Sequence, residues 1–171
     1  TAATMASTPA HQQARGITYS KKWNHVAVSN NQGDVTILDY NDFSKRITTL
    51  MKPREWCECL AYSPDENYLA LGSHDDSIYI YKISETGDYT LHWSITFVHS
   101  SAIVGMDWSR GSKFLRAVDQ AYAKMFYNVE DLQHVEDDVQ LQHRLVAHSV
   151  ICLRHVDLEQ HRRDGDNERS S

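Results

Sequence analysis

The sequence predicts an all-β fold built from about three repeated four-stranded units, the blades of an incomplete β-propeller. The chain repeats itself with a period of 43 to 46 residues, and the repeated segments are rich in β-branched and aromatic residues. A shift of 43 positions places Tyr19 on Tyr62 and Val26 on Leu69, and a further shift of 46 places Leu69 on Leu115. This period matches WD-type blades of roughly 40 to 45 residues and is too long for ankyrin or tetratricopeptide units.

Strand content distinguishes this propeller from helical repeats of similar period. Segments 35–38 and 78–83 are dense in Val, Ile, Thr and Tyr, as strands are. Each follows a polar turn, at 30–34 or 74–76, whose Gly, Asn and Asp residues accept the backbone angles that a hairpin needs. The alternative is an unrelated antiparallel sandwich with a chance repeat, but one register holds over about twenty positions.

The three blades are expected over residues 16–52, 53–98 and 99–129. In the third, Arg116 stands where the earlier repeats have Ala70 and Ala27, and a fourth strand is uncertain. The expected strands are 17–20, 25–29, 34–40 and 45–50 in the first blade, 57–62, 68–72, 77–83 and 89–97 in the second, and 102–108, 113–118 and 122–128 in the third.

The two ends of the chain differ in composition from the repeats. Residues 1–15 are expected to be disordered, and residues 130–171 form an acidic and histidine-rich tail that is expected to be partly helical, over about 140–160, or disordered. The tail histidines lack the i, i+4 spacing that would place two metal ligands on one helical face. They are His143, His148, His155 and His161.

Charge and composition disfavour several classes of function. A formal net charge of −6 argues against a nucleic-acid-binding protein, which needs a concentrated basic face. No apolar stretch approaches the length of a transmembrane helix, and three cysteines without a regular framework favour a reducing compartment such as the cytoplasm. We find no nucleophile elbow, phosphate-binding glycine loop or paired-carboxylate motif, so we expect no enzyme and no cofactor.

Two cysteines lie close together in a predicted strand. Cys57 and Cys59 are expected to send their thiols to opposite faces of that strand, which is a poor geometry for a shared zinc ion. No second cysteine pair or suitably spaced histidine accompanies them. We therefore expect no metal site, and we interpret both cysteines as small buried hydrophobic residues.

Several short motifs carry a resemblance to a known family over about residues 16–129. The chain resembles the echinoderm microtubule-associated protein-like family, whose members carry a similar turn–strand–turn followed by an aromatic strand. The resemblance implies tandem seven-bladed propellers that bind tubulin and microtubules, often in mitotic or ciliary settings. The motifs are Ser63-Pro64-Asp65, Tyr68-Leu69-Ala70, Gly72-Ser73-His74-Asp75, His99-Ser100-Ser101 and Asp107-Trp108-Ser109.

Antiparallel connections predict one binding surface. The turn between the second and third strands of a blade lies at the same end as the link into the next blade, and such loops commonly carry function on a rigid scaffold. Alternatively, His99 and Asp75 belong to a hydrogen-bond network that braces a blade, whereas Trp56 and Arg54 are better candidates for partner contact. The predicted interaction face comprises Asn30, Asn31, Gln32, Lys52, Arg54, Trp56, His74, Asp75, Asp76, His99 and Ser100.

The sequence also contains one concentration of basic residues: Lys45, Arg46, Lys52 and Arg54. Because the surface of tubulin is acidic, such a cluster would assist docking through complementary charge. The alternative is an ordinary solvated outer strand.

Three blades cannot close a ring, so we expect two open flanks with exposed apolar faces. We expect missing blades from another chain, or self-association, to cover them. Our leading hypothesis is a microtubule-associated scaffold that binds tubulin or axonemal partners and resides in the cytoplasm and cytoskeleton, in a cilium or on a mitotic spindle. The alternative is a general WD-repeat adaptor in signalling or transport complexes. Neither reading involves nucleic acid or a membrane.

Overall fold

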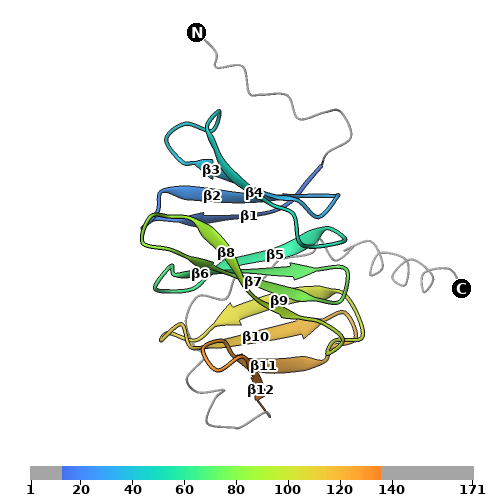
Figure 1. Ribbon diagram of the computed structural model, residues 1–171. Coiled ribbons are helices and arrows are strands. Elements are labelled where there is room, and N and C mark those ends of the chain that lie inside the picture. Colours follow the sequence, from blue (N-terminus) through green and yellow to red (C-terminus); the bar gives the residue numbers. More distant parts are fainter. Residues whose placement is uncertain (1–12, 136–171) are drawn as a thin grey trace, which may run out of the picture.

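The computed structural model describes residues 13–135, and within them every regular element is a β-strand. Three four-stranded antiparallel sheets follow one another along the chain and lie stacked side by side (Figure 1). The predicted fold class, about three blades of an incomplete propeller, is confirmed. The helix expected over about 140–160 lies outside the described residues. None of the described residues belongs to a helix that could cross a membrane.

The first sheet begins earlier than the sequence indicated. Residues 14 and 15 were expected to be disordered, but they belong to its first strand, where Ala14 lies opposite Asn30 and the Gly16 N–H donates to Ser29 Oγ at 2.8 Å. These hydrogen bonds extend the strand beyond its apolar segment. The strands are β1 (Ala14–Ser20), β2 (His25–Asn30), β3 (Val35–Asp39) and β4 (Arg46–Leu50).

The third sheet ends later than expected, because a fourth strand lies beyond residue 129. The Asn128 side chain organises the preceding turn, where Asn128 Oδ1 accepts the Asp131 N–H at 3.2 Å. The second sheet contains β5 (Cys57–Tyr62), β6 (Tyr68–Ser73), β7 (Ile78–Ile83) and β8 (Tyr89–Ile95), and the third contains β9 (Ile103–Trp108), β10 (Phe114–Asp119), β11 (Lys124–Asn128) and β12 (Gln133–Val135).

The strand register repeats with the sequence. Val26 lies opposite Leu38 in the first sheet, and the positions 43 residues later, Leu69 and Tyr81, lie opposite each other in the second. The positions 46 residues further on, Leu115 and Tyr127, are again paired in the third sheet. The three sheets are therefore copies of one unit, as the internal repeat requires.

The core consists of two layers, one on each side of the second sheet. Because side chains alternate along a strand, Leu69 and Leu71 of β6 pack toward the first sheet while Ala70 packs toward the third. Ile37 and Val35 meet the second sheet in the first layer. Residues of the third sheet complete the second layer: Ile103, Met106, Trp108, Leu115, Ala117, Tyr127 and Val129.

The two cysteines of β5 lie in different core layers, Cys57 in the first and Cys59 in the second. Residues two apart in a regular strand face the same side, so simple alternation was the wrong reason for expecting them apart. A break in the β5–β6 register between Cys57 and Cys59 separates them. Burial raises the pKa of the Cys57 thiol to about 12, so this thiol stays protonated.

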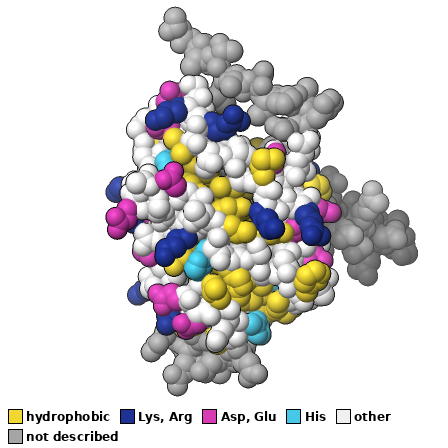
Figure 2. Space-filling model, viewed as in Figure 1, with side chains coloured by type: hydrophobic (Ala, Val, Ile, Leu, Met, Phe, Trp, Pro, Cys, Tyr) yellow, Lys and Arg dark blue, Asp and Glu magenta, His cyan; other side chains and the backbone are white. Residues whose placement is uncertain are grey.

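Tryptophan side chains tie neighbouring sheets together at their inner edges. The Trp108 Nε1–H donates to the Ala61 carbonyl oxygen at 3.1 Å, joining the third sheet to the second. The Trp23 Nε1–H donates to the Glu66 carbonyl oxygen at 2.6 Å, joining the first sheet to the second. Figure 2 shows hydrophobic side chains at the surface where the second and third sheets meet. Because these hydrogen bonds link separate sheets, the loops are held on one connected platform.

The two outward faces of the stack differ in chemistry. On the first sheet, Ile17 and Tyr19 are 69% and 44% exposed and point away from the second sheet, because Thr18 is paired with the core residue Ala27. On the third sheet, Arg116 forms an ion pair with Asp107. The expectation of two apolar flanks is therefore wrong for the third sheet, since Arg116 replaces the small residue of the earlier repeats.

Candidate protein-interaction face

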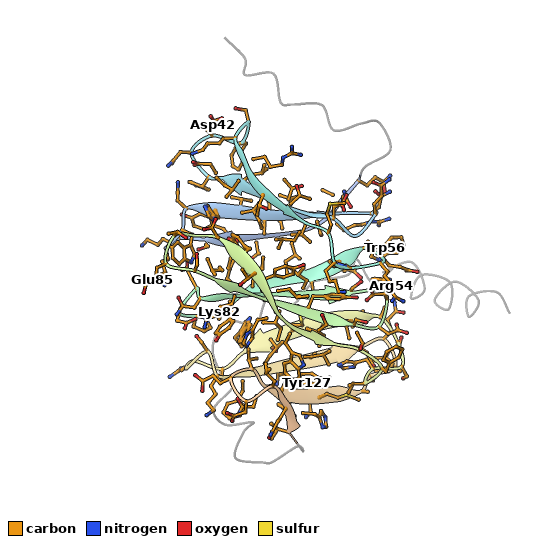
Figure 3. All side chains as sticks on the ribbon, viewed as in Figure 1. Asp42, Arg54, Trp56, Lys82, Glu85 and Tyr127 are labelled. Atoms are coloured by element: carbon orange, nitrogen blue, oxygen red, sulfur yellow. The ribbon has the colours of Figure 1, made fainter. Side chains whose placement is uncertain are left out.

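All eleven residues of the predicted interaction face lie at one end of the sheets. They come from the β2–β3 and β6–β7 turns and the β4–β5 and β8–β9 links, and we call this end, with the β10–β11 turn, the interaction face. Figure 3 shows Arg54 and Trp56 at this end, with Asp42 and Glu85 at the opposite one. The antiparallel order of strands produces this separation.

The β2–β3 turn is shaped by its own side chains. Asn30 Oδ1 accepts the backbone N–H of Gln32 at 2.9 Å and that of Asp34 at 3.0 Å. The Asn31 N–H donates to the Gln13 carbonyl oxygen at 3.0 Å. Asn30 therefore fixes the turn, and the exposed Gln32 is the member of the three most open to solvent.

Trp56 is a packed, half-buried residue of the interaction face. The Arg15 guanidinium lies 4.3 Å from its ring centroid, and the His74 ring meets it edge-on at 4.7 Å. His74 Nε2 lies 2.9 Å from Glu58 Oε2. These two contacts hold the indole in place, so Trp56 is a preorganised part of the face.

Asp75 connects the β6–β7 turn to the β4–β5 link. Its Oδ2 accepts the Arg54 backbone N–H at 2.9 Å and the Tyr79 hydroxyl at 2.7 Å. Its Oδ1 is buried and has no hydrogen-bond partner among residues 13–135. Burial, together with the hydrogen bond to Asp75, raises the pKa of Tyr79 to about 12, so the phenol remains a donor.

His99 belongs to a different network from Asp75. Its Nδ1 lies 3.2 Å from Asp119 Oδ2 and its Nε2 lies 2.8 Å from the Tyr127 hydroxyl, and the His99 and Asp119 side chains are fully buried. The expectation that His99 and Asp75 brace a blade as a pair is wrong, because the Asp that reaches His99 is Asp119, the last residue of β10. His99 braces the third blade, and Asp75 braces the second.

The four predicted basic residues do not gather into one cluster. Lys45 and Arg46 stand at the start of β4, where Lys45 Nζ lies 3.2 Å from Asp39 Oδ2. Lys52 and Arg54 follow the other end of that strand and reach the interaction face. The strand separates the pairs, so only Lys52 and Arg54 contribute positive charge to the interaction face.

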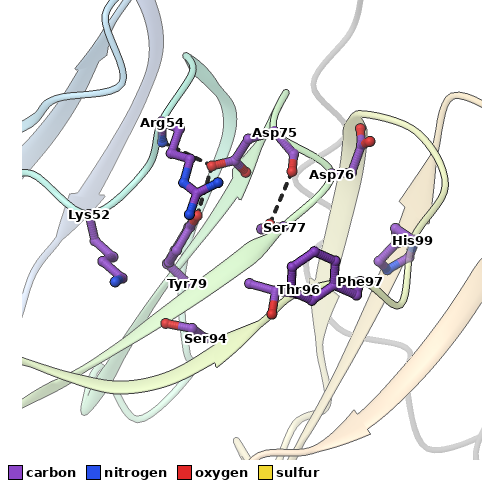
Figure 4. A pocket seen from close by; sticks show the side chains of 10 residues that line it. All are labelled: Lys52, Arg54, Asp75, Asp76, Ser77, Tyr79, Ser94, Thr96, Phe97 and His99. Carbon is purple, nitrogen blue, oxygen red and sulfur yellow. Dashed lines mark hydrogen bonds between the residues drawn. The ribbon is translucent and has the colours of Figure 1, made fainter.

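A pocket of about 430 Å³ opens on the interaction face over the second sheet (Figure 4). Lys52 and Arg54 line one side, and Asp76 and His99 line the other. The pocket therefore has a side with two cations, next to which Asp75 contributes one carboxylate, and an acidic rim at Asp76. Hydroxyl groups and one aromatic ring complete the lining, from Ser77, Tyr79, Ser94, Thr96 and Phe97.

Sequence reasoning missed three exposed apolar residues of the interaction face. Met51, Phe97 and Tyr122 are 76%, 99% and 91% exposed, and they lie in the β4–β5 link, the β8–β9 link and the β10–β11 turn. Phe97 and Tyr122 have positive φ values of 62° and 65°, which are uncommon for aromatic residues. Phe97 and Tyr122 were expected at the ends of strands 89–97 and 122–128, but β8 ends at Ile95 and β11 begins at Lys124, so both lie in loops.

Known proteins share this architecture. A β-propeller domain of Cps50 (Swd1) from Myceliophteria thermophila has a TM-score of 0.66 at 12% identity and covers 74% of this chain and 43% of that one. A chain of a mitotic checkpoint complex has a TM-score of 0.65 at 16% identity and covers 76% and 38%. At such low identity these likenesses show the fold alone.

Curated relatives are more similar in sequence. The ciliary WD repeat-containing protein ctxp80 of Euplotoides octocarinatus is 42% identical over 110 residues, 64% of this chain and 15% of the relative. Echinoderm microtubule-associated protein-like 3 of Homo sapiens is 34% identical over 104 residues, 61% of this chain and 12% of the relative. The chain thus spans a small fraction of their length. The model of the echinoderm microtubule-associated protein second beta-propeller matches residues 1–156, so the chain belongs to this family.

Proposed function

We propose that the chain is part of a microtubule-associated scaffold that binds tubulin or axonemal proteins through its interaction face. The observation that carries the proposal is the match to the second propeller of echinoderm microtubule-associated proteins over residues 1–156. A relative with 42% identity is named as a ciliary protein, which supports a place in the cytoplasm and cytoskeleton, in a cilium or on a spindle. The scaffold acts by holding partners, without catalysis.

Co-sedimentation with taxane-stabilised microtubules tests this function. The purified chain is expected in the microtubule pellet, and Lys52→Ala/Arg54→Ala should lower the bound fraction because it removes positive charge from the face. The matched control is Lys45→Ala/Arg46→Ala, which removes the same charge at the opposite end of β4. A chain that stays in the supernatant contradicts microtubule binding and favours the general WD-repeat adaptor.

We also propose that the apolar face of the first sheet is covered by a further blade, supplied by another chain, by a second copy or by the rest of a longer protein. Tyr19, Tyr40 and Phe43 form a continuous aromatic row there, with ring centroids 4.7 and 6.1 Å apart. All three are 44–53% exposed. An apolar row on the side of a sheet is typical of a surface that packs against another element.

A further inference from the structure

We propose that the pocket over the second sheet binds an acidic peptide segment, with a carboxylate between Lys52 and Arg54 and an apolar side chain against Phe97. The inference rests on the proposed use of the interaction face for protein partners, but it does not require that the partner be tubulin. The pocket volume of about 430 Å³ lies within the range of roughly 300–1,000 Å³ for ligand pockets.

The cationic side of the pocket is available to a ligand. Lys52 and Arg54 are exposed, and neither forms an ion pair with any residue of the described part of the chain. By contrast, Lys45 already contacts Asp39. Two unpaired cations that line one side of a concave site favour a carboxylate, which accepts charge-assisted hydrogen bonds from both.

The acidic rim sets the direction of the bound segment. Asp76 lies on the side of the pocket opposite Lys52 and Arg54 (Figure 4). A second carboxylate of the ligand would be repelled there, whereas a neutral or basic residue would be accepted. The pocket therefore fits a segment whose acidic residue lies on the Lys52 side.

Asp75 favours a peptide over a bare anion. Asp75 lines the pocket, and its Oδ2 already accepts the Arg54 backbone N–H and the Tyr79 hydroxyl. Its negative charge near Arg54 favours a ligand that brings a hydrogen-bond donor as well as an acidic group. A peptide supplies a backbone N–H beside its carboxylate, whereas a fully ionised anion supplies no donor.

Phe97 supplies the apolar contact. Its side chain is 99% exposed and lines the pocket, and its backbone has a φ of 62°. A positive φ is uncommon for an aromatic residue, and here it occurs in a link that leaves the ring outside the core. The ring is presented to solvent next to Thr96, across the pocket from the two cations (Figure 4), where an apolar side chain of the peptide would cover it.

Fluorescence anisotropy with labelled synthetic peptides tests the proposal on the full 171-residue chain. The probe is a short peptide with one glutamate and one phenylalanine among neutral residues, and a peptide with lysine in place of the glutamate is its control. We expect the acidic peptide to bind at least about tenfold more tightly than the lysine peptide, and its affinity to fall with added salt.

Two matched pairs of variants locate the site. Lys52→Glu/Arg54→Glu should weaken binding of the acidic peptide by about tenfold or more, while Lys45→Glu/Arg46→Glu should change it by less than about twofold. Phe97→Ala should weaken it severalfold, while Phe43→Ala, exposed at the opposite end of its sheet, should not. Circular dichroism confirms that each variant is folded.

The proposal would be overturned if the acidic peptide did not bind, or if the two double variants lost the same amount of affinity for it. The two proposals can fail separately. If the chain binds the acidic peptide but stays in the supernatant with microtubules, the pocket proposal is supported and tubulin is contradicted as the partner. If the chain pellets with microtubules but does not bind the peptide, the proposed function is supported and the pocket proposal is contradicted.

Discussion

Single residues decide how firmly the interaction face is held, and Tyr127 is the clearest case. Its buried hydroxyl reaches His99 Nε2, and His99 Nδ1 in turn lies beside Asp119, so a β11 side chain fixes the β8–β9 link to the end of β10. Burial raises the pKa of Tyr127, so its hydroxyl stays a donor. The Tyr127 side chain reaches His99 from β11, so the position of the β8–β9 link depends on the third sheet.

Tyr127→Phe is expected to destabilise the chain by about 1–3 kcal/mol, because it leaves a buried imidazole nitrogen without its donor. Urea unfolding followed by circular dichroism measures the change. Tyr122→Phe is the matched control, since the Tyr122 side chain is 91% exposed and its hydroxyl can bond to water. Equal stabilities for the two variants would show that the His99 network does not hold the blade.

His25 makes the stability of the chain depend on pH. It lies at the start of β2, buried, with Nδ1 3.0 Å from the Tyr89 hydroxyl of the second sheet. Burial lowers its pKa below 6.5, and the nearby Lys45 lowers it further while Asp39 opposes the shift. The unfolded chain therefore takes up a proton more readily than the folded chain, so stability present above pH 6.5 is lost as the pH falls below it.

We expect the melting temperature to fall more between about pH 7.5 and about pH 5.5 for the wild type than for His25→Gln. Glutamine keeps a polar group near Tyr89 but does not titrate. The other histidines contribute equally to both proteins, so the difference isolates His25. Parallel pH profiles would contradict the assigned role.

At the scale of the strands, much of the fold could be predicted because one repeat fixes the register of several strands at once. Leu69 and Tyr81 are paired because Val26 and Leu38 are, and the same hydrophobic pattern specifies both pairs. β12 could not be placed, because it has three residues and an exposed surface, and its turn depends on the Asn128 side chain. The β5 bulge also leaves no signal in the sequence pattern.

The interaction face was predictable only to the level of its loops. Strand order alone places Asn30, Asp75 and His99 at one end, and the structure has them there. The partner of each side chain depends on which turn reaches it, so His99 was assigned to Asp75 although it contacts Asp119. Phe97 is exposed in a link where its φ is positive, and an aromatic residue in the sequence gives no sign of such a conformation.

The packing of one strand against the next blade depends on a glycine. A Cβ atom added to Gly72 of β6 would lie 2.7 Å from Ile103 Cγ2 and 3.2 Å from Cys59 Cβ. Because Ile103 is fully buried in the layer between the second and third sheets, it has little room to move. Gly72 thus permits the close approach of β6 and β9.

Gly72→Ala is expected to cost about 1–3 kcal/mol through overpacking of this layer. Gly111→Ala is the control, because a Cβ atom there meets nothing within 4 Å. Chemical denaturation should show a lower midpoint for Gly72→Ala and an unchanged or higher midpoint for Gly111→Ala. A Gly72→Ala variant as stable as the wild type would mean that the two blades are not closely packed.

For the molecule as a whole, the important asymmetry lies between its two outer faces. The first sheet presents the aromatic row of Tyr19, Tyr40 and Phe43, whereas the third presents the Arg116–Asp107 ion pair. Stacking the charged face of one copy on the apolar face of another would remove the ion pair from water, which is costly. The apolar face is therefore expected to meet an apolar face, either that of a further blade or that of a second copy.

In the absence of further blades, this face should make the chain associate as its concentration rises. Tyr19→Ser/Phe43→Ser is expected to reduce that association, because it removes exposed aromatic area from the row while leaving the buried layers intact. Leu91→Ser/Leu132→Ser is the matched control, since these leucines are 43% and 44% exposed elsewhere on the molecule. Analytical ultracentrifugation over a range of concentrations measures the effect. If the wild-type chain sediments as a monomer throughout the range, the aromatic row can remain exposed to solvent and needs no covering blade.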